Sequence, residues 1–280
     1  LGAMLGGAGA PPLCLCHRLD KETTGVMVLA RGAEAAARVR LLFKERRVEK
    51  VYWAIALGQP EPTEGVVDIP VVEKEVQGGQ AHFKMTLAPN YRLDREAGKE
   101  VKIRKARGAE SAVTRYRVLA AASGCSLLEL QPITGKRRRR RSRCVPLPTG
   151  SGDVSPLPGA GVKHQIRVHL AYGLGCPILG DHKYSHWRKL APQVSARRRA
   201  RLPRRPLRSP ARSRPQKLPE VTLKRLKLEQ AKARHLPLHL HARRLSLPPG
   251  TGAAPLELLC QPPAFFRNTL RRLKLEPAEA

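Results

Sequence analysis

The sequence predicts a protein of the α+β class, with a mixed sheet whose strands are mostly antiparallel. The main observation is that segments with the alternating or β-branched pattern of strands follow one another along the chain. Few long helical segments separate these strands, which favours antiparallel pairing between neighbours. The chain has 280 residues, which is enough to bury a core in one large domain or two small ones.

The first elements are predicted from the spacing of apolar residues. Residues 26–30 are apolar and β-branched, which predicts a buried strand. Residues 33–48 place apolar side chains at helical spacing and charged side chains on the other face, which predicts a helix with a solvated outer face. A strand is expected at residues 50–57 and a short one within residues 65–73.

The later elements continue the same pattern. Residues 77–111 are polar and basic and contain glycine, which predicts a surface hairpin or loop that can lie along RNA. Helical spacing occurs at residues 223–226, and a short closing helix is expected from Pro262 to Leu273. Further strands are expected at residues 112–119, 126–130, 238–245 and 256–261.

The charge of the chain predicts its class of partner. The formal net charge is +31 and the sequence pI is about 11.1, so the surface is suited to a polyanion such as RNA or DNA. Aromatic residues make up only 4% of the chain, which argues against a module that binds single strands by a row of stacking rings. The charge indicates a partner but no activity.

Cysteine usage and hydropathy limit the class further. The six cysteines form no CxxC pair, and no cysteine–histidine group has zinc spacing, so we expect free thiols in a reducing compartment and no metal site. No apolar run approaches the roughly 20 residues that a membrane helix needs. The chain begins at Leu1, and residues 1–13 stay unassigned; we expect the true amino terminus, with any targeting peptide, to be missing.

The stretch at residues 17–25 is the first candidate for chemistry. Arg18 and Lys21 flank Asp20 shortly before Gly25, and an apolar run follows. Asp20 is therefore expected at the mouth of the sheet, where a carboxylate can act as a nucleophile or a base. The alternative from the residues alone is that Asp20 caps a turn.

Several motifs together resemble one family. H-R-L-D-K-x-T-x-G at residues 17–25 resembles the catalytic signature of the RluA-type RNA pseudouridine synthases. K-x-Y-x-A at residues 50–54 resembles the second family motif, and P-x-T-G at 132–135 with H-Q-I-R-x-H at 164–169 resembles the third. G-x-P-I-x-G-D-x-x-Y at residues 175–184 also matches, where Pro and Gly suit a tight turn. The resemblance covers residues 14–193 and 217–275, except for 136–161.

The resemblance implies a fold and an activity. The fold is the bent, largely antiparallel sheet of the pseudouridine synthases, with helices and loops around a basic cleft, here lacking its amino-terminal part; residues 14–275 form the catalytic domain. The activity is the conversion of uridine to pseudouridine in rRNA, tRNA or mRNA, with no cofactor and with the target base flipped out of its stack. A monomer in the mitochondrial matrix is expected.

The resemblance also assigns catalytic roles. Asp20 is the catalytic carboxylate, which either attacks the sugar carbon or abstracts its 2′ proton; the sequence leaves both open. Arg167 is expected to pair with Asp20 and keep it ionised, because a nearby opposite charge favours the charged form. Tyr52 is expected to pack against the uracil and to be placed for proton transfer.

Four further residues are expected to bind RNA. Arg18 suits the displaced phosphate or the gap left by the flipped base. His164 and Gln165 are expected to line the cleft, either by direct contact or in support. Lys163, beside them in the third motif, completes the set.

Two basic segments, residues 136–161 and 194–216, interrupt the match. Both lack periodicity and are rich in arginine, proline or glycine, which predicts disorder. Our hypothesis is that both are translated retained introns or gene-model errors, since their codons allow splice-like ends and their lengths keep the frame. The alternative is a genuine basic insertion that grips RNA. Because the segments contribute +15, the remaining chain keeps a net charge of +16 and still favours nucleic acid.

Two functions from other classes remain as alternatives. A catalytically inactive RNA-binding or ribosome-assembly protein would explain the interruption at residue 136, although all three motifs are present. A nonspecific basic DNA-binding protein would explain the charge but none of the motifs.

Overall fold

The computed structural model describes residues 12–76, 82–89, 91–93, 100–102, 106–133, 161–185, 216–249 and 254–277. The predicted disorder of segments 136–161 and 194–216 lies outside the described residues, apart from Gly161 and Gln216. Of the expected surface hairpin or loop at 77–111, the structure describes 82–89, 91–93, 100–102 and 106–111, where strands at 82–87, 91–93 and 100–102 belong to two antiparallel ribbons.

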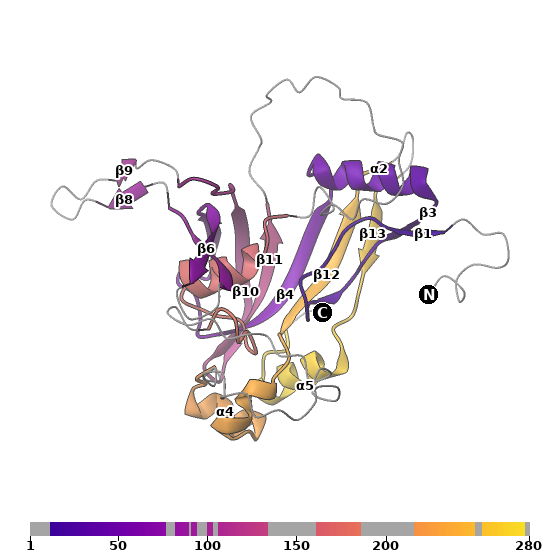
Figure 1. The fold of residues 1–280 in the computed structure, drawn as a ribbon. Coiled ribbons are helices and arrows are strands. Elements are labelled where there is room, and N and C mark those ends of the chain that lie inside the picture. Colours follow the sequence, from indigo (N-terminus) through magenta and orange to yellow (C-terminus); the bar gives the residue numbers. More distant parts are fainter. Residues whose placement is uncertain are drawn as a thin grey trace, which may run out of the picture.

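A seven-stranded sheet forms the centre of the fold, which confirms the predicted α+β class (Figure 1). Its strands run antiparallel to their neighbours, except that the short β2 (Thr24–Gly25) pairs parallel with β12. The order along the sheet is β13 (Leu256–Leu259), β12 (Leu240–Leu247), β4 (Glu49–Leu57), β11 (Cys125–Pro132), β10 (Val113–Ala122) and β5 (Glu64–Asp68).

Three two-stranded ribbons and several short helices complete the described part. The ribbons are β1 (Leu13–Leu15) with β3 (Leu29–Arg31), β6 (Val71–Val76) with β7 (His82–Leu87), and β8 (Tyr91–Leu93) with β9 (Glu100–Lys102). The helices are α2 (Ala33–Lys44), α3 (Gln165–Val168), the π-helix η1 (His169–Gly173), α4 (Glu220–Leu226), the 3₁₀ helix η3 (Gln230–His235) and α5 (Ala264–Leu273). Figure 1 shows α2 at one end of the sheet and α4 and α5 at the other.

Both faces of the central strands are buried. Successive residues of a strand point to opposite faces, and Ala54 and Ile55 of β4 accordingly belong to different apolar clusters. On one face Ala54 packs with Ile166 and Leu170 of α3 and η1. On the other, Ile55 packs with residues of α4 and α5, including Phe266. The third-motif helix is thus held against the sheet by its own apolar residues.

The strand predicted at residues 26–30 is wrong in its first part. Strand β3 begins only at Leu29, and Met27 is 46% exposed. The backbone N–H of Val26 donates to the carbonyl of Ala242, and that of Val28 donates to the imidazole of His17. These bonds lead the chain from the edge of β12 toward the β1–β3 ribbon, so the apolar residues serve packing rather than strand pairing.

The helix predicted over residues 33–48 is shorter than expected. Helix α2 ends at Lys44, and Arg46 has a φ of 61°, in the left-handed region where a helix cannot continue. The four residues after Lys44 therefore turn the chain into β4, which starts at Glu49.

Candidate active site

A cavity of about 590 Å³ lies where the loop after β1, strand β4 and the segment before α3 meet. It brings together residues that are far apart in the sequence. Six of the seven predicted site residues line it, namely Arg18, Asp20, Tyr52, Lys163, His164 and Gln165. The seventh, Arg167, has no exposed surface and lies in the next part of α3.

The loop that carries Asp20 is fixed at both ends. Before it, His17 stacks on Phe43 with ring centroids 4.6 Å apart, and its Nε2 accepts a hydrogen bond of 2.8 Å from the backbone N–H of Val28. Burial lowers the pKa of His17 to about 4, so its imidazole is neutral at physiological pH. After it, Gly25 passes directly against Ala242 of β12.

Asp20 stands in a turn through its backbone, which leaves its side chain to the cavity. The carbonyl oxygen of Asp20 accepts a hydrogen bond of 3.0 Å from the backbone N–H of Thr23. Its carboxylate makes no hydrogen bond or ion pair within the described part of the chain. The turn is therefore closed by the backbone of Asp20, and the alternative in which its side chain caps the turn does not describe these contacts.

The environment of Asp20 raises the pKa of its carboxyl group. Burial raises the pKa of Asp20 above that of an ordinary aspartate, and the negative charge of Asp181 adds to this. The positive charges of Arg167, Arg18 and Lys183 act in the opposite direction but do not outweigh burial. A carboxylate with a raised pKa is a stronger base than one in water.

Arg167 is paired with Asp181 rather than with Asp20. Its Nε and Nη2 each donate a hydrogen bond of 2.8 Å to the carboxylate of Asp181, and the two side chains are 0% and 1% exposed. No ion pair joins Arg167 to Asp20 among the described residues, so the expected contact is replaced by attraction through space. The third guanidinium nitrogen, Nη1, is buried without a partner in the described structure.

Tyr52 projects from the central strand β4 into the same cavity as Asp20. Burial raises the pKa of Tyr52, and the negative charge of Asp20 raises it further. Its phenol therefore keeps its proton at physiological pH and can donate a hydrogen bond or present its ring. Tyr52 is therefore close enough to Asp20 for the charge of the carboxylate to act on the phenol.

His164 precedes helix α3 with a φ of 55°, and a hydrogen bond joins its Nδ1 to the hydroxyl of Tyr184. Burial lowers the pKa of His164 to about 2, and four nearby cations, Arg167 first among them, lower it in the same direction. His164 is therefore a neutral imidazole at the cavity wall.

The side-chain amide nitrogen of Gln165 is hydrogen-bonded to the sheet. Its Nε2 donates to the carbonyl of Val113 at 2.8 Å and to Thr114 Oγ1 at 3.0 Å, both on β10. Its Oε1 is buried without a hydrogen-bond partner in the described structure. Of the two roles left open from the sequence, these contacts fit support of the wall.

The two predicted RNA-binding cations differ in their contacts. Arg18 is exposed at the cavity. Lys163 instead forms an ion pair of 2.7 Å with Glu73 of β6, and both side chains are about half-exposed. The sequence did not indicate that an acidic residue shares this rim.

Two residues near the site were missed by sequence reasoning. Asp181 belongs to the G-D-x-x-Y motif, which the sequence analysis interprets only as a turn, although an acidic residue in a matched motif could have pointed to a partner for Arg167. Lys50, the first residue of K-x-Y, lines the cavity, and burial lowers its pKa. Both lay inside motifs that had already been noted.

Other kinds of site are not formed by the described residues. Within these ranges no group of three His, Cys, Asp or Glu side chains is placed to hold a metal ion. The five cysteines in the described ranges are free thiols. None of the described helices has the length and apolar character needed to cross a membrane.

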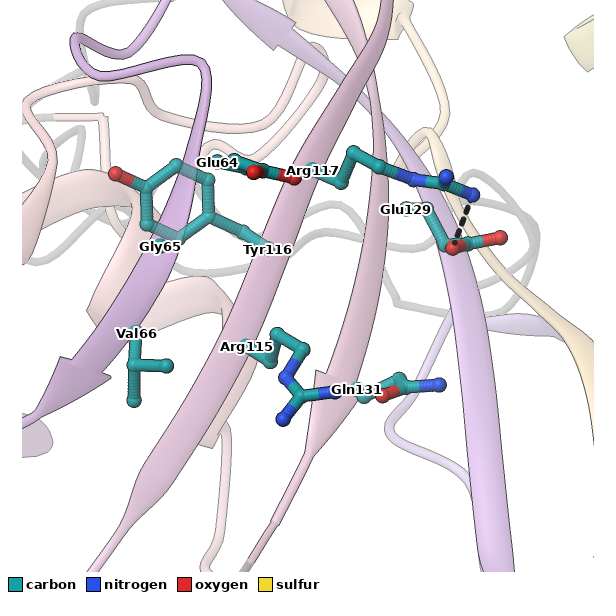
Figure 2. Close-up of a pocket in the computed structure, with 8 residues that line it drawn as sticks. All are labelled: Glu64, Gly65, Val66, Arg115, Tyr116, Arg117, Glu129 and Gln131. Atoms are coloured by element: carbon teal, nitrogen blue, oxygen red, sulfur yellow. Dashed lines mark hydrogen bonds and ion pairs between the residues drawn. The ribbon is translucent and has the colours of Figure 1, made fainter.

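Figure 2 shows a second cavity, of about 510 Å³, over strands β5, β10 and β11. Its lining holds two cations, Arg115 and Arg117, and two carboxylates, Glu64 and Glu129, and Arg117 pairs with Glu129 at 3.0 Å. None of the predicted site residues lines it. The first cavity is therefore the candidate active site.

Comparisons with known proteins agree with the motifs. A family model described as RNA pseudouridylate synthase matches residues 6–144. The chain is 50% identical over 277 residues to the human protein named Pseudouridylate synthase RPUSD4, mitochondrial, a match that covers 99% of this chain and 60% of the human one. The Xenopus tropicalis protein of the same name is 46% identical over 273 residues, covering 98% of this chain and 69% of that protein.

A solved structure supports the same assignment. Human RNA Pseudouridylate Synthase Domain Containing 4 matches with a TM-score of 0.70 and 46% identity, covering 99% of this chain and 81% of that chain. The chain spans about 60% of the length of its human and mouse relatives. These matches confirm the resemblance read from the motifs, and the chain belongs to the RNA pseudouridylate synthase family.

Proposed function

We propose that the protein converts uridine to pseudouridine in RNA, with Asp20 as the catalytic carboxylate. The observation that carries the proposal is the position of Asp20, whose side chain faces a cavity together with Tyr52 and beside the buried Arg167. Membership of the RNA pseudouridylate synthase family supports the reaction. The net charge of +31 supports an RNA substrate.

The reaction exchanges the C1′–N1 bond of uridine for a C1′–C5 bond. The hydrogen on C5 is released to solvent, and N1 gains a proton, so the product is an isomer and no cofactor is required. Asp20 either attacks the sugar carbon or removes its 2′ proton, and both steps need the ionised carboxylate. Its neighbours fit this assignment, since Tyr52 and His164 are held neutral and Asp20 is the carboxylate whose charge acts on Tyr52.

The target base must leave its stack to reach Asp20. A cavity of about 590 Å³ falls in the range of sites that enclose small molecules or a single nucleotide. Tyr52 offers a ring to the uracil, and the exposed Arg18 offers a cation to phosphate or to the gap in the duplex. Rigid support from Gln165 and His164 keeps the wall in place.

The names of the relatives suggest where the protein acts and on which RNA. The matched relatives are named mitochondrial, so we propose that this protein acts in the mitochondrial matrix on rRNA, tRNA or mRNA. We propose a monomer. Lys163 joins the phosphate contacts once RNA phosphate competes with Glu73 for its ammonium group.

One observation favours a second candidate, an RNA-binding protein without activity. Pro132 and Gly161, which flank the basic segment, both line the cavity of Asp20. Seven cations attached at that rim can hold RNA in an unproductive position or draw Asp20 into an ion pair.

Tritium release separates the two candidates. RNA transcribed with [5-³H]uridine is incubated with the protein, and the released tritium is counted while RNA binding is measured in parallel. The proposed enzyme releases tritium in step with the formation of pseudouridine, detected by mass spectrometry of nucleosides. Tight binding without release on any mitochondrial RNA would favour the inactive protein.

A further inference from the structure

The two ring nitrogens of His164, which lines the cavity of Asp20, lie in different surroundings. Its Nδ1 is hydrogen-bonded to the hydroxyl of Tyr184, a side chain that is 1% exposed. Its Nε2 makes no hydrogen bond within the described part of the chain, and it is not one of the nitrogens buried there without a partner. One end of the imidazole is therefore anchored in the protein, and the other end is open to the cavity.

The hydroxyl of Tyr184 determines which ring nitrogen carries the proton. A hydroxyl has one proton to donate, and its oxygen here also accepts a hydrogen bond from the backbone of Met85. No acceptor other than Nδ1 of His164 is bonded to this hydroxyl among the described residues. A proton on Nδ1 would leave the buried hydroxyl proton without an acceptor, which is unfavourable. The proton of the neutral imidazole therefore lies on Nε2.

The charges around His164 keep its ring neutral. Burial lowers the pKa of His164 to about 2, and four positive side chains act in the same direction. They are Arg167, Lys183, Lys163 and Arg18. A neutral N–H attracts no phosphate by charge, so the Nε2–H group suits an uncharged acceptor such as the edge of a base. Contacts to base edges are the ones that carry specificity.

We propose that His164 donates its Nε2–H to the O4 carbonyl of the flipped uracil, with the tautomer set by Tyr184, and so selects uracil against cytosine. The proposal rests on the proposed function. Cytosine carries an amino group at C4 in place of O4, so two donors would face each other. A site built to form a hydrogen bond rejects an analogue that lacks the acceptor, because its own donor is then left without a partner.

The position of O4 on the ring fits the reaction. O4 lies across the uracil from N1, and N1 carries the sugar on which Asp20 acts in the proposed reaction. A contact at O4 therefore leaves Asp20 and the breaking bond uncovered. A contact at O2, which cytosine also has, would give no discrimination between the two bases. His164 is thus a specificity-determining residue as well as part of the cavity wall.

The tautomer is tested without RNA. Long-range ¹H–¹⁵N NMR spectra distinguish a ring nitrogen that carries a proton from one that does not, and the signals of His164 are assigned by their loss in His164→Asn. Asparagine suits this position, because His164 has a φ of 55°. We expect a neutral ring with its proton on Nε2 from about pH 6 to about pH 8. A proton on Nδ1, or a charged ring, would overturn the proposal.

Discrimination between the bases is the second readout. Mass spectrometry first locates a uridine that the wild-type protein converts in mitochondrial RNA, and a matched RNA carries cytidine at that position. Binding is measured on an Asp20→Asn background, so that the uridine is not consumed. We expect about tenfold tighter binding of the uridine RNA, and binding of the two RNAs within about twofold once His164→Asn is added.

Tyr184→Phe removes only the hydroxyl that sets the tautomer and orientation of His164. On the same background it should lose about threefold or more of the discrimination. Tyr172→Phe is the matched control, because Tyr172 lies against Tyr184 with ring centroids 6.0 Å apart and is not bonded to His164 in the described structure. This variant should keep the discrimination of the protein that has both tyrosines.

The contradicting results are distinct. Conversion by the wild-type protein together with unchanged discrimination in His164→Asn would overturn this proposal alone. If His164→Asn does not fold, equal discrimination in Tyr184→Phe and Tyr172→Phe would overturn it. Absence of conversion by the wild-type protein, with the proton found on Nε2, would instead overturn the proposed function.

Discussion

Gly25 passes so close to Ala242 that a Cβ on Gly25 would lie 2.3 Å from the carbonyl oxygen of Ala242. Gly25 also has a φ of 121°, a conformation that side chains rarely adopt. The contact pairs β2 with β12 in parallel, and a hydrogen bond of 2.9 Å between Thr24 and His241 adds to it. The loop of Asp20 is therefore attached to the sheet at a position where only glycine fits.

Replacing this glycine should separate backbone overlap from backbone strain. We expect Gly25→Ala to reduce the free energy of unfolding by about 4 kcal/mol or more, or to prevent folding, because strand backbone has to move. Gly108 is the matched control, since its φ of 77° is also positive but nothing lies within 4 Å of an added Cβ. Gly108→Ala should cost only about 1–2 kcal/mol. Urea unfolding of both variants makes the comparison.

Equal losses in the two variants would contradict the account. They would mean that the conformation of Gly25, and not its approach to Ala242, is what the fold requires.

The raised pKa of Asp20 predicts a stability gain in Asp20→Asn. The folded state binds the proton of Asp20 more tightly than the unfolded state, so ionisation costs stability as the pH rises through the folded pKa. Asn carries no charge, and the variant should melt a few degrees higher at pH 7.5, where about 1 kcal/mol corresponds to about 2–4 °C.

The gain should shrink as the pH falls, because the raised pKa of Asp20 lets the folded wild-type protein take up this proton before the unfolded chain does. Thermal melts from about pH 4 to pH 8 measure it, with the exposed Asp68→Asn as the control for loss of a negative charge. A lower melting temperature for Asp20→Asn at pH 7.5 would show that the cations outweigh burial.

The ion pair between Lys163 and Glu73 predicts an RNA-affinity change. Glu73→Gln removes an acid from the cavity rim and frees Lys163 for phosphate, so RNA should bind about twofold to fivefold more tightly. The salt dependence should steepen by about 0.7–0.9, the value for one added phosphate contact. Fluorescence anisotropy across salt concentrations measures both.

Glu45→Gln is a matched control, because Glu45 pairs with Arg47 at similar exposure after α2 and does not line the cavity. An equal gain in affinity in this variant would assign the effect to net charge rather than to Lys163.

Gln216 refines the hypothesis of two inserted segments. It is 1% exposed, its Oε1 accepts from the backbone N–H of Gly180 at 2.8 Å, and its Nε2 donates to the carbonyl of Ile178 at 2.9 Å. Gln216 is the second residue of a Pro-Gln pair, and the same pair also occurs at residues 192–193. Deletion of residues 194–216 therefore puts Gln193 directly before Lys217, where it can make the same two bonds.

We expect Gln216→Ala to cost about 1–3 kcal/mol in the full chain, since two buried backbone groups lose their partner. Gln193→Ala should cost the same in a protein lacking residues 194–216 and much less in the full chain. Urea unfolding of the full chain, the deletion protein and their three variants tests this. A deletion protein that is insensitive to Gln193→Ala would show that the segment is an integral part of the fold.

Much of the site was predictable because its motifs lie on elements with strong local patterns. Tyr52 sits on a strand with a long apolar run, and the third motif leads into α3 and η1, whose Ile166 and Leu170 pack against that strand. Resemblance supplied the association of Asp20 with these residues, and the structure brings them to one cavity. From spacing alone, Asp20 could be either the cap of a turn or a catalytic carboxylate.

The rest depends on contacts that a chain pattern does not contain. The pattern does not tell which of two carboxylates, Asp20 or Asp181, takes the guanidinium of Arg167, because both lie close in space and far from each other in sequence. Val26 and Val28 looked like strand residues because they are apolar. They pack against the cluster of Phe43 instead.

The central claim is that Asp20 performs the chemistry, and tritium release by Asp20→Asn tests it most directly. The variant and the control Asp68→Asn are compared with the wild type at equal RNA occupancy, with affinity measured separately. We expect Asp20→Asn to release no tritium above background while it binds RNA within a few-fold of wild type, since a carboxylate near phosphate does not favour binding. Asp68→Asn should keep full activity. Substantial turnover by Asp20→Asn would contradict the account.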